Sequence, residues 1–195
     1  MKVSIPSKRV CEVIRVMHGS KLASWLNGDS QALIVDNKSL SELTTVLFDE
    51  VQPSDWILLE GDLGAGKTTF VSSLLSHFSK GSVFTSPTFS LLNVHEFPSA
   101  SIIKRACHLD LYRIRSDEEL IHIGLELQVN EASLVLIEWS ENVSPDGWSS
   151  FFNVTYCRRP KRIIRISIEH LEQPSIRRYT FDWLRYDELV GQIHS

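Results

Sequence analysis

Features that mark membrane, secreted and disulfide-bonded proteins are scarce in this sequence. Its 195 residues include only three cysteines, Cys11, Cys107 and Cys157, which are odd in number, far apart and without metal-ligand spacing. No apolar run approaches the ~20 residues of a membrane-spanning helix, and the N-terminal region has no continuous apolar segment typical of a secretory signal. These absences exclude a disulfide scaffold and a membrane-spanning protein. They predict a cytoplasmic protein with reduced thiols and no membrane association.

Composition and charge add a weaker constraint. The sequence has no internal repeat or low-complexity segment, which excludes a repeat protein. Its hydrophobic content of 43% and charged content of 23% are ordinary for a globular domain. The net charge of −4 is unevenly distributed, because residues 1–21 and 158–185 are basic and the middle is acidic. Such asymmetry is found at partner or nucleic-acid contacts, although each basic cluster alone is equally consistent with a solvated surface.

The strongest positive signal is the segment 61–68. It matches the phosphate-loop pattern G-x-x-x-x-G-K followed by Ser or Thr at every fixed position. An apolar run at 56–60 precedes it and predicts a buried strand, and residues 69–78 are typical of a helix. Strand, glycine loop and helix N-terminus together indicate an anion-binding cradle.

The chemistry of this cradle assigns roles to its residues. The glycines let several backbone N–H groups point at one phosphate chain, and the helix dipole adds partial positive charge. Lys67 can reach the β- and γ-phosphates, and the Thr68 hydroxyl can bind Mg²⁺. The residues of this segment that we expect to bind the nucleotide are Gly61, Gly64, Ala65, Gly66, Lys67, Thr68 and Thr69.

Residues 86–89 form a polar Ser-Pro-Thr-Phe turn further along the chain. A threonine on a mobile loop beside the γ-phosphate is what a nucleotide-sensing switch needs, and Thr88 is the candidate. An ordinary Ser-Pro-Thr turn explains the same residues equally well. The residues alone leave both interpretations open.

Two carboxylates follow apolar strands. Glu138 ends the run at 134–137, and Asp110 lies near the end of the apolar stretch at 106–112. A carboxylate at the C-terminal edge of a buried parallel strand lies beside the phosphate loop, where it can hold Mg²⁺ directly or through water. Glu138 is therefore a candidate to bind Mg²⁺ together with Thr68, and Asp110 is placed to face metal or water near Lys67. A strand that ends in Glu is also common without such a role.

Apolar periodicity predicts the remaining elements. Strands are expected over residues 32–35, 56–60, 89–95, 106–112, 134–139, 151–157 and 163–170, and helices over residues 39–50, 69–78 and 181–193. The last two strands would form a hairpin whose tip, residues 158–162, is basic.

This order predicts an α/β fold of the P-loop NTPase kind. Its three layers would enclose a mixed sheet, parallel around the phosphate loop and antiparallel elsewhere. Residues 1–30 would be an N-terminal extension of unknown role, residues 31–170 the P-loop ATPase domain and residues 171–195 a helical C-terminal tail.

These motifs together resemble the TsaE family (formerly YjeE), the small P-loop ATPase of bacterial threonylcarbamoyladenosine tRNA modification. The resemblance covers about residues 32–157 and keeps the family's order and approximate spacing. The matching stretches are residues 60–70, 86–89, 108–113, 123–126 and 137–139. The combination is highly specific, whereas the phosphate loop alone is not.

The resemblance implies a concrete role. Family members bind ATP with Mg²⁺, hydrolyse it slowly and associate with the TsaB–TsaD heterodimer. That heterodimer transfers a threonylcarbamoyl group to adenosine 37 of tRNAs that read A-starting codons, and ATP turnover supports repeated cycles. By motif, Lys67 would hold the phosphates, Thr68 and Glu138 would bind Mg²⁺, Asp110 would be needed for hydrolysis and Thr88 would lie on the switch-like loop. Trp139 would flank the site, as a packing residue or a nucleotide contact.

Three alternatives are weaker. A free-standing small-molecule kinase needs an arginine-bearing lid, and only Arg113 and Arg115 lie near the motifs. A GTP-binding switch is disfavoured because no N-K-x-D guanine signature follows the phosphate loop. The basic segment 158–162 would contact tRNA directly in a third hypothesis, although an indirect or weak contact, protein docking or a solvated surface explains it as well.

Overall fold

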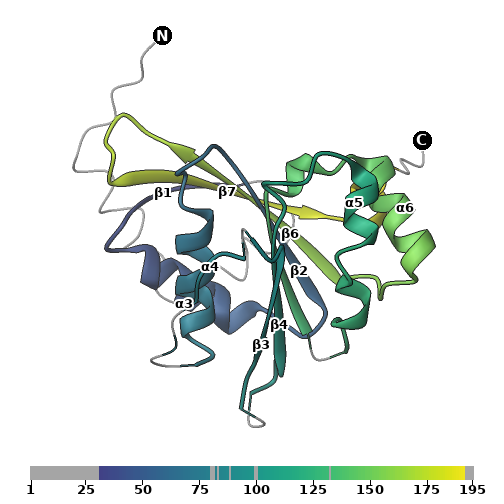
Figure 1. The fold of residues 1–195 in the computed structure, drawn as a ribbon. Coiled ribbons are helices and arrows are strands. Elements are labelled where there is room, and N and C mark those ends of the chain that lie inside the picture. The colour runs from purple at the N-terminus through teal and green to yellow at the C-terminus, as the bar shows by residue number, and fades with distance from the viewer. Residues whose placement is uncertain are drawn as a thin grey trace.

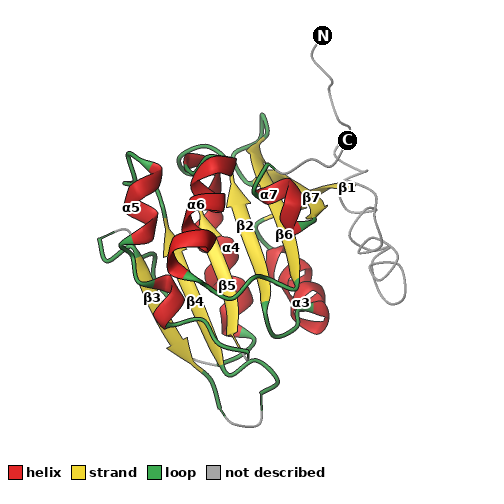
Figure 2. Cartoon of the chain, turned by 90° about the vertical axis from the view of Figure 1, so that its right-hand side faces the viewer, coloured by secondary structure: helices red, strands yellow, loops and turns green. Residues whose placement is uncertain are grey.

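One mixed sheet runs through the molecule. The computed structural model describes residues 31–79, 82, 84–87, 89–98, 101–131 and 133–191, so the expected N-terminal extension lies outside the described residues. Its seven strands follow the order β1-β7-β6-β2-β5-β4-β3 (Figures 1 and 2). The strands are β1 (Gln31–Asp36), β2 (Asp55–Glu60), β3 (Leu92–Glu96), β4 (Arg105–Asp110), β5 (Ser133–Glu138), β6 (Arg162–His170) and β7 (Ile176–Leu184).

The central strands are parallel and the edges are antiparallel. β2 pairs in parallel with both β5 and β6, and β4 pairs in parallel with β5. The pairs β3–β4, β6–β7 and β1–β7 are antiparallel. This arrangement confirms the predicted mixed sheet, with its parallel part around the segment 61–68.

Helices cover both faces of the sheet and complete three layers. α3 and α4 pack on one face, whereas α5, α6 and α7 pack on the other (Figures 1 and 2). In the described part of the chain, none of the helices has the length and apolar composition needed to span a lipid bilayer. The helices are α3 (Leu40–Glu50), α4 (Lys67–Ser76), α5 (Asp117–Ile121), α6 (Pro145–Thr155) and α7 (Tyr186–Leu189), with 3₁₀ turns η1 (Leu125–Leu127) and η2 (Ser140–Asn142).

The sequence of β2 explains why the sheet is covered twice. Successive side chains of a strand point to opposite faces. Ile57 and Leu59 therefore join the core under α3 and α4, while Trp56 and Leu58 join the core under α5 and α6. All four side chains are at most 2% exposed. A continuous apolar run is what a strand needs when both of its faces are buried.

The parallel register brings three sequence-distant segments to one edge of the sheet. Leu59, the penultimate residue of β2, lies opposite Glu138, and Glu138 lies opposite Asp110. The segment 61–68 leaves the same edge directly after β2. Open α/β sheets bind ligands at this carboxyl edge of their strands.

The prediction of a strand at 151–157 is wrong. Residues 145–155 form α6, whose N-cap Ser144 accepts a hydrogen bond from the Gly147 N–H at 3.0 Å. Pro145 occupies the first helical position, where its missing N–H costs nothing. Trp148, Phe151 and Phe152 then share one helix face and are buried against the sheet. The apolar residues of 151–157 predicted a strand, but the Ser-Pro start and the helical spacing of the buried side chains favour a helix.

The predicted hairpin and the predicted terminal helix are therefore also wrong. β6 pairs with β2 in parallel and with β7, and no strand at 151–157 exists to pair with it. Residues 176–184 form β7, in which Tyr179, Phe181 and Trp183 at alternate positions pack toward one core. A helix occurs only at 186–189, and residues 192–195 lie outside the described part.

The basic segment 158–162 is largely engaged within the fold. Arg162 Nε donates to Asp55 Oδ1 at 2.9 Å, and its NH2 group donates to Asp55 Oδ2 at 2.5 Å and to the Glu50 carbonyl at 2.8 Å. Asp55 is fully buried, so this bidentate contact compensates a buried charge. Arg158 pairs with Glu131 at 3.0 Å, and Arg159 lies over the Tyr186 ring.

This pairing predicts a large difference between two neighbouring basic residues. Arg162→Ala should lower the free energy of unfolding by about 3 kcal/mol, because it leaves the buried Asp55 carboxylate unpaired. Lys161→Ala, at an exposed position, should change it by less than about 0.5 kcal/mol. Urea denaturation measures both values. Equal effects of the two substitutions would show that the Arg162–Asp55 pair does not stabilise the fold.

Candidate functional site

The loop between β2 and α4 is shaped by three glycines with positive φ. Gly61, Gly64 and Gly66 have φ of 136°, 78° and 107°. Side chains other than hydrogen are strained in this region, which explains the glycine spacing. α4 begins at Lys67, directly after the loop, so its N-terminal N–H groups and dipole face the cradle.

Lys67 lies inside this loop. Its side chain is buried, and Nζ donates to the carbonyl oxygens of Gly61 and Asp62, the latter at 3.1 Å. Nζ also lies 3.3 Å from the centroid of the Trp139 ring. Burial lowers the pKa of the Lys67 ammonium, while nearby carboxylates, first Glu141, act in the opposite direction. The ammonium is thus held within the loop by two carbonyl oxygens and the Trp139 ring.

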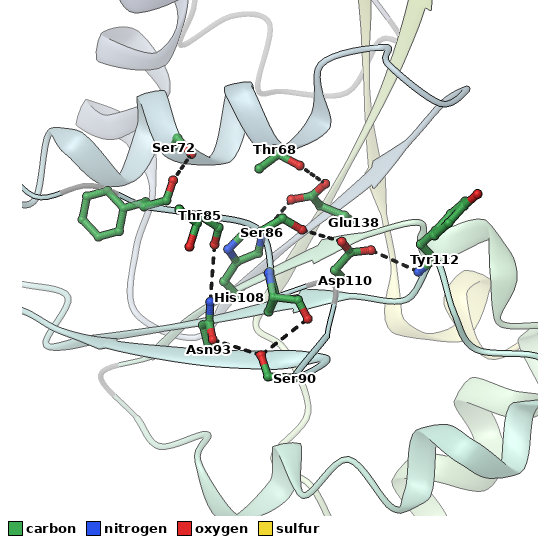
Figure 3. A network of polar contacts seen from close by, with 12 residues as sticks. Thr68, Ser72, Thr85, Ser86, Ser90, Asn93, His108, Asp110, Tyr112 and Glu138 are labelled. Carbon is green, nitrogen blue, oxygen red and sulfur yellow. Dashed lines mark hydrogen bonds and ion pairs between the residues drawn. The ribbon is translucent and has the colours of Figure 1, made fainter.

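Thr68 and Glu138 are in direct contact. The Thr68 Oγ1 hydroxyl donates to Glu138 Oε2 at 2.7 Å (Figure 3). Glu138 is the last residue of β5 and is only 1% exposed. A hydroxyl and a carboxylate are the hard oxygen ligands that Mg²⁺ prefers.

This donor set fits a magnesium ion that also binds phosphates and water. Among the described residues, no cluster of three or more His, Cys, Asp or Glu side chains could hold a metal by itself. Mg²⁺ in phosphate-binding enzymes is typically bound through one or two protein ligands plus substrate phosphates and water. Thr68 and Glu138 together match that requirement.

The second oxygen of Glu138 is held by His108. His108 is fully buried in β4, and its Nε2 lies 2.8 Å from Glu138 Oε1. Its Nδ1 has no hydrogen-bond partner within the described ranges. The Glu138 carboxylate is therefore fixed between a helix hydroxyl and a strand imidazole (Figure 3).

Asp110 ends β4 beside Glu138. It is 3% exposed and accepts hydrogen bonds from the Ser86 hydroxyl and from the Tyr112 N–H, the latter at 3.1 Å. Ser86 belongs to the polar turn at 86–89, so this turn is linked to the strand-end carboxylate (Figure 3). Thr88 lies outside the described residues, and its role stays a prediction.

Two aromatic side chains lie close to Lys67 of the loop. The Tyr112 and Trp139 rings lie 5.0 Å apart, and Trp139 has a φ of 61°. Leu63 and Phe89 are 74% and 86% exposed. Arg113, one of the two arginines considered for a kinase lid, lies over the Phe89 ring at 4.3 Å.

Comparison with known proteins identifies the family. The sequence model described as threonylcarbamoyl adenosine biosynthesis protein TsaE matches residues 34–175. The chain belongs to the TsaE family. The match includes the glycine loop, Asp110 and Glu138, and it ends just before β7.

Named relatives agree with this membership, and a solved structure agrees with the fold. The TsaE of Rickettsia typhi is 41% identical over 105 residues, which cover 53% of this chain and 69% of that protein. The TsaE of a Nostoc species is 36% identical over 129 residues, covering 64% of this chain and 76% of that protein. Both relatives are named tRNA threonylcarbamoyladenosine biosynthesis protein TsaE. Bacillus subtilis YdiB has a TM-score of 0.56 at 19% identity, covers 84% of this chain and 93% of its own, and supports the fold.

The structure brings the predicted residues Lys67, Thr68, Asp110 and Glu138 of this TsaE-family protein to one edge of the sheet. Sequence reasoning did not assign His108, although a histidine two positions before Asp110 in an apolar strand was a usable signal. It also missed Glu141, whose Oε1 accepts the Gly61 N–H at 3.0 Å. No sequence pattern around Glu141, which lies two residues after Trp139, indicated this contact.

Two glycine substitutions in the loop should differ sharply. A Cβ at Gly61 would lie 2.3 Å from the Ile168 carbonyl oxygen, whereas a Cβ at Gly66 would meet nothing within 4 Å. Gly66→Ala should cost about 1–2 kcal/mol of stability through backbone strain. Gly61→Ala adds a backbone clash and should cost at least about 3 kcal/mol. Chemical denaturation compares them, and equal losses would rule out close packing of the loop on β6.

Proposed function

We propose that this TsaE-family protein binds ATP with Mg²⁺ and hydrolyses it slowly during formation of threonylcarbamoyladenosine at adenosine 37 of tRNAs reading A-starting codons. It would act with a TsaB–TsaD-like heterodimer and would not perform the transfer itself. Membership in the family and the names of its relatives support the general role in this modification. The site described above supports the nucleotide chemistry.

The observation that carries the proposal is the 2.7 Å contact between Thr68 Oγ1 and Glu138 Oε2. It joins the first turn of the helix after the glycine loop to the end of the neighbouring parallel strand. P-loop hydrolases hold Mg²⁺ with a Ser or Thr of the phosphate loop and with a carboxylate at a strand end, an Asp in the usual pattern and Glu138 in this chain. When bound there, Mg²⁺ would neutralise charge on the phosphate oxygens.

The other residues would bind the phosphates of ATP and position the attacking water. The loop N–H groups and Lys67 would hold the phosphates of ATP. Asp110 is buried, hydrogen-bonded to Ser86 and directly beside Glu138. It would position the water that attacks, and its link to Ser86 would let the turn at 86–89 respond to the nucleotide.

The kinase alternative has less support. A lid arginine must reach the phosphates, but Arg113 lies over the Phe89 ring. The tRNA-contact hypothesis is also weakened, because Arg158, Arg159 and Arg162 have partners within the fold. We therefore propose at most an indirect or weak contact with tRNA.

The metal site can be tested at Thr68 alone. Thr68→Val keeps the shape but removes the hydroxyl, and Thr68→Ser keeps the hydroxyl. Mg²⁺ should tighten ATP binding to the wild type and to Thr68→Ser by about tenfold or more, and Thr68→Val should lose this gain. Calorimetric titrations with Mg²⁺ or with EDTA give the ratio. A normal Mg²⁺ gain in Thr68→Val would rule out the hydroxyl as a ligand.

The reaction is tested by ATP hydrolysis with and without purified TsaB–TsaD heterodimer. We expect turnover that depends on the heterodimer and falls at least about 100-fold in Lys67→Ala and Glu138→Ala. Lys161→Ala, exposed and away from the loop, is the matched control and should retain full activity. Phosphorylation of a small acceptor without the heterodimer would overturn the proposal in favour of a kinase.

A further inference from the structure

Arg177 of β7 reaches the glycine loop from 112 residues away in the sequence. Its Nε donates to the carbonyl oxygen of Ala65 at 3.0 Å. Its NH1 group donates to the carbonyl oxygens of Pro174 at 2.6 Å and Ile176 at 3.0 Å, which fixes the guanidinium against its own strand. The side chain is half-buried, and its strand lies beyond the segment matched by the family model.

This contact decides which way one peptide group of the loop points. In a planar trans peptide, the carbonyl oxygen and the next N–H point in opposite directions. Because Arg177 holds the Ala65 oxygen toward β7, the Gly66 N–H points away from β7. In the described part of the chain, the Ala65 N–H donates to the Asp62 oxygen, whereas no backbone carbonyl accepts from the Gly66 N–H.

The Ala65–Gly66 peptide needs such a restraint. Glycines at 64 and 66 flank Ala65, and a glycine after the peptide lets it rotate with little steric cost. The first part of the loop is restrained from the same hairpin, because Gly61 packs closely against the Ile168 carbonyl of β6. The pairing of β6 with β7 places Arg177 opposite His170 and so positions it near the loop.

We propose that Arg177 is a positioning residue for phosphate binding, which orients the Gly66 N–H into the cradle so that it can donate to a phosphate oxygen of a nucleoside di- or triphosphate. This inference rests on the proposed function, since it concerns the same cradle. It adds a residue of the C-terminal strand to the phosphate site. Its action is through a hydrogen bond to the loop carbonyl, with no contact to the nucleotide required.

Two substitutions at Arg177 separate the hydrogen bond from packing. Glutamine places its Nε2 donor at the chain position of the arginine Nε, and methionine places a methyl group there. Arg178→Met is the matched control, because Arg178 is the next residue and pairs with Glu169 at 2.8 Å on the surface. The probe is the non-hydrolysable ATP analogue AMP-PNP with Mg²⁺, titrated by calorimetry.

Arg177→Met should weaken AMP-PNP binding by about tenfold, because a misdirected N–H loses one charge-assisted hydrogen bond. Arg177→Gln should stay within about threefold of the wild type, and Arg178→Met within about twofold. Equal binding by Arg177→Met and the wild type would overturn the inference alone. A wild type that binds no AMP-PNP would overturn the proposed function together with it.

The Gly66 amide gives an independent readout. Its proton resonance should move downfield when MgADP is added to the wild type and to Arg177→Gln, because it then donates to a phosphate. It should move less in Arg177→Met. Thermal unfolding of each variant without nucleotide controls for stability. If the Gly66 resonance moves as far in Arg177→Met as in the wild type, Arg177 has a packing role and the proposal is contradicted. The same holds if both Arg177 variants lose binding in proportion to their loss of stability.

Discussion

The buried carboxylate of Glu138 links the helix and the two strands that form the site. An ionised carboxylate that is 1% exposed is stable only when its oxygens have partners. Thr68 takes one oxygen and His108 takes the other, so α4, β5 and β4 are linked through a single group. The glycine loop, which ends in α4, is thereby kept in register with the strand that carries Asp110.

The sheet supplies the complementary support. Its parallel strands aim their carboxyl ends at one edge, and the antiparallel β6–β7 pair continues the sheet next to the loop. Gly61 packs on β6, and Ala65 is held by Arg177 of β7. β7 therefore helps to support a loop that begins more than a hundred residues earlier in the sequence.

The sequence alone predicted those features of the fold and the site that short local patterns control. The loop motif, the strand before it and the carboxylates Asp110 and Glu138 follow from short runs and from the rule that parallel strand ends meet. The strands at 134–139 and 163–170 were predicted correctly, whereas the strand at 151–157 was not, because the helix start at Ser144 and Pro145 decides the structure of that segment. Arg177 contacts a partner 112 residues away, which no local pattern reveals. The partner of His108 is 30 residues away, and only the place of this histidine in an apolar strand before Asp110 hinted at it.

The contacts of Lys67 have a consequence for what the cradle can discriminate. Its ammonium already donates to two loop carbonyls and lies on the Trp139 ring. An arriving anion must therefore exchange with these partners, and the net free energy of binding is a difference between two sets of contacts. A single phosphate replaces few of them, whereas a polyphosphate replaces them together with the contacts along the loop. If the loop binds phosphate as proposed, this competition from its own carbonyls would favour long phosphate chains over inorganic phosphate, and no group that repels the smaller anion would be needed.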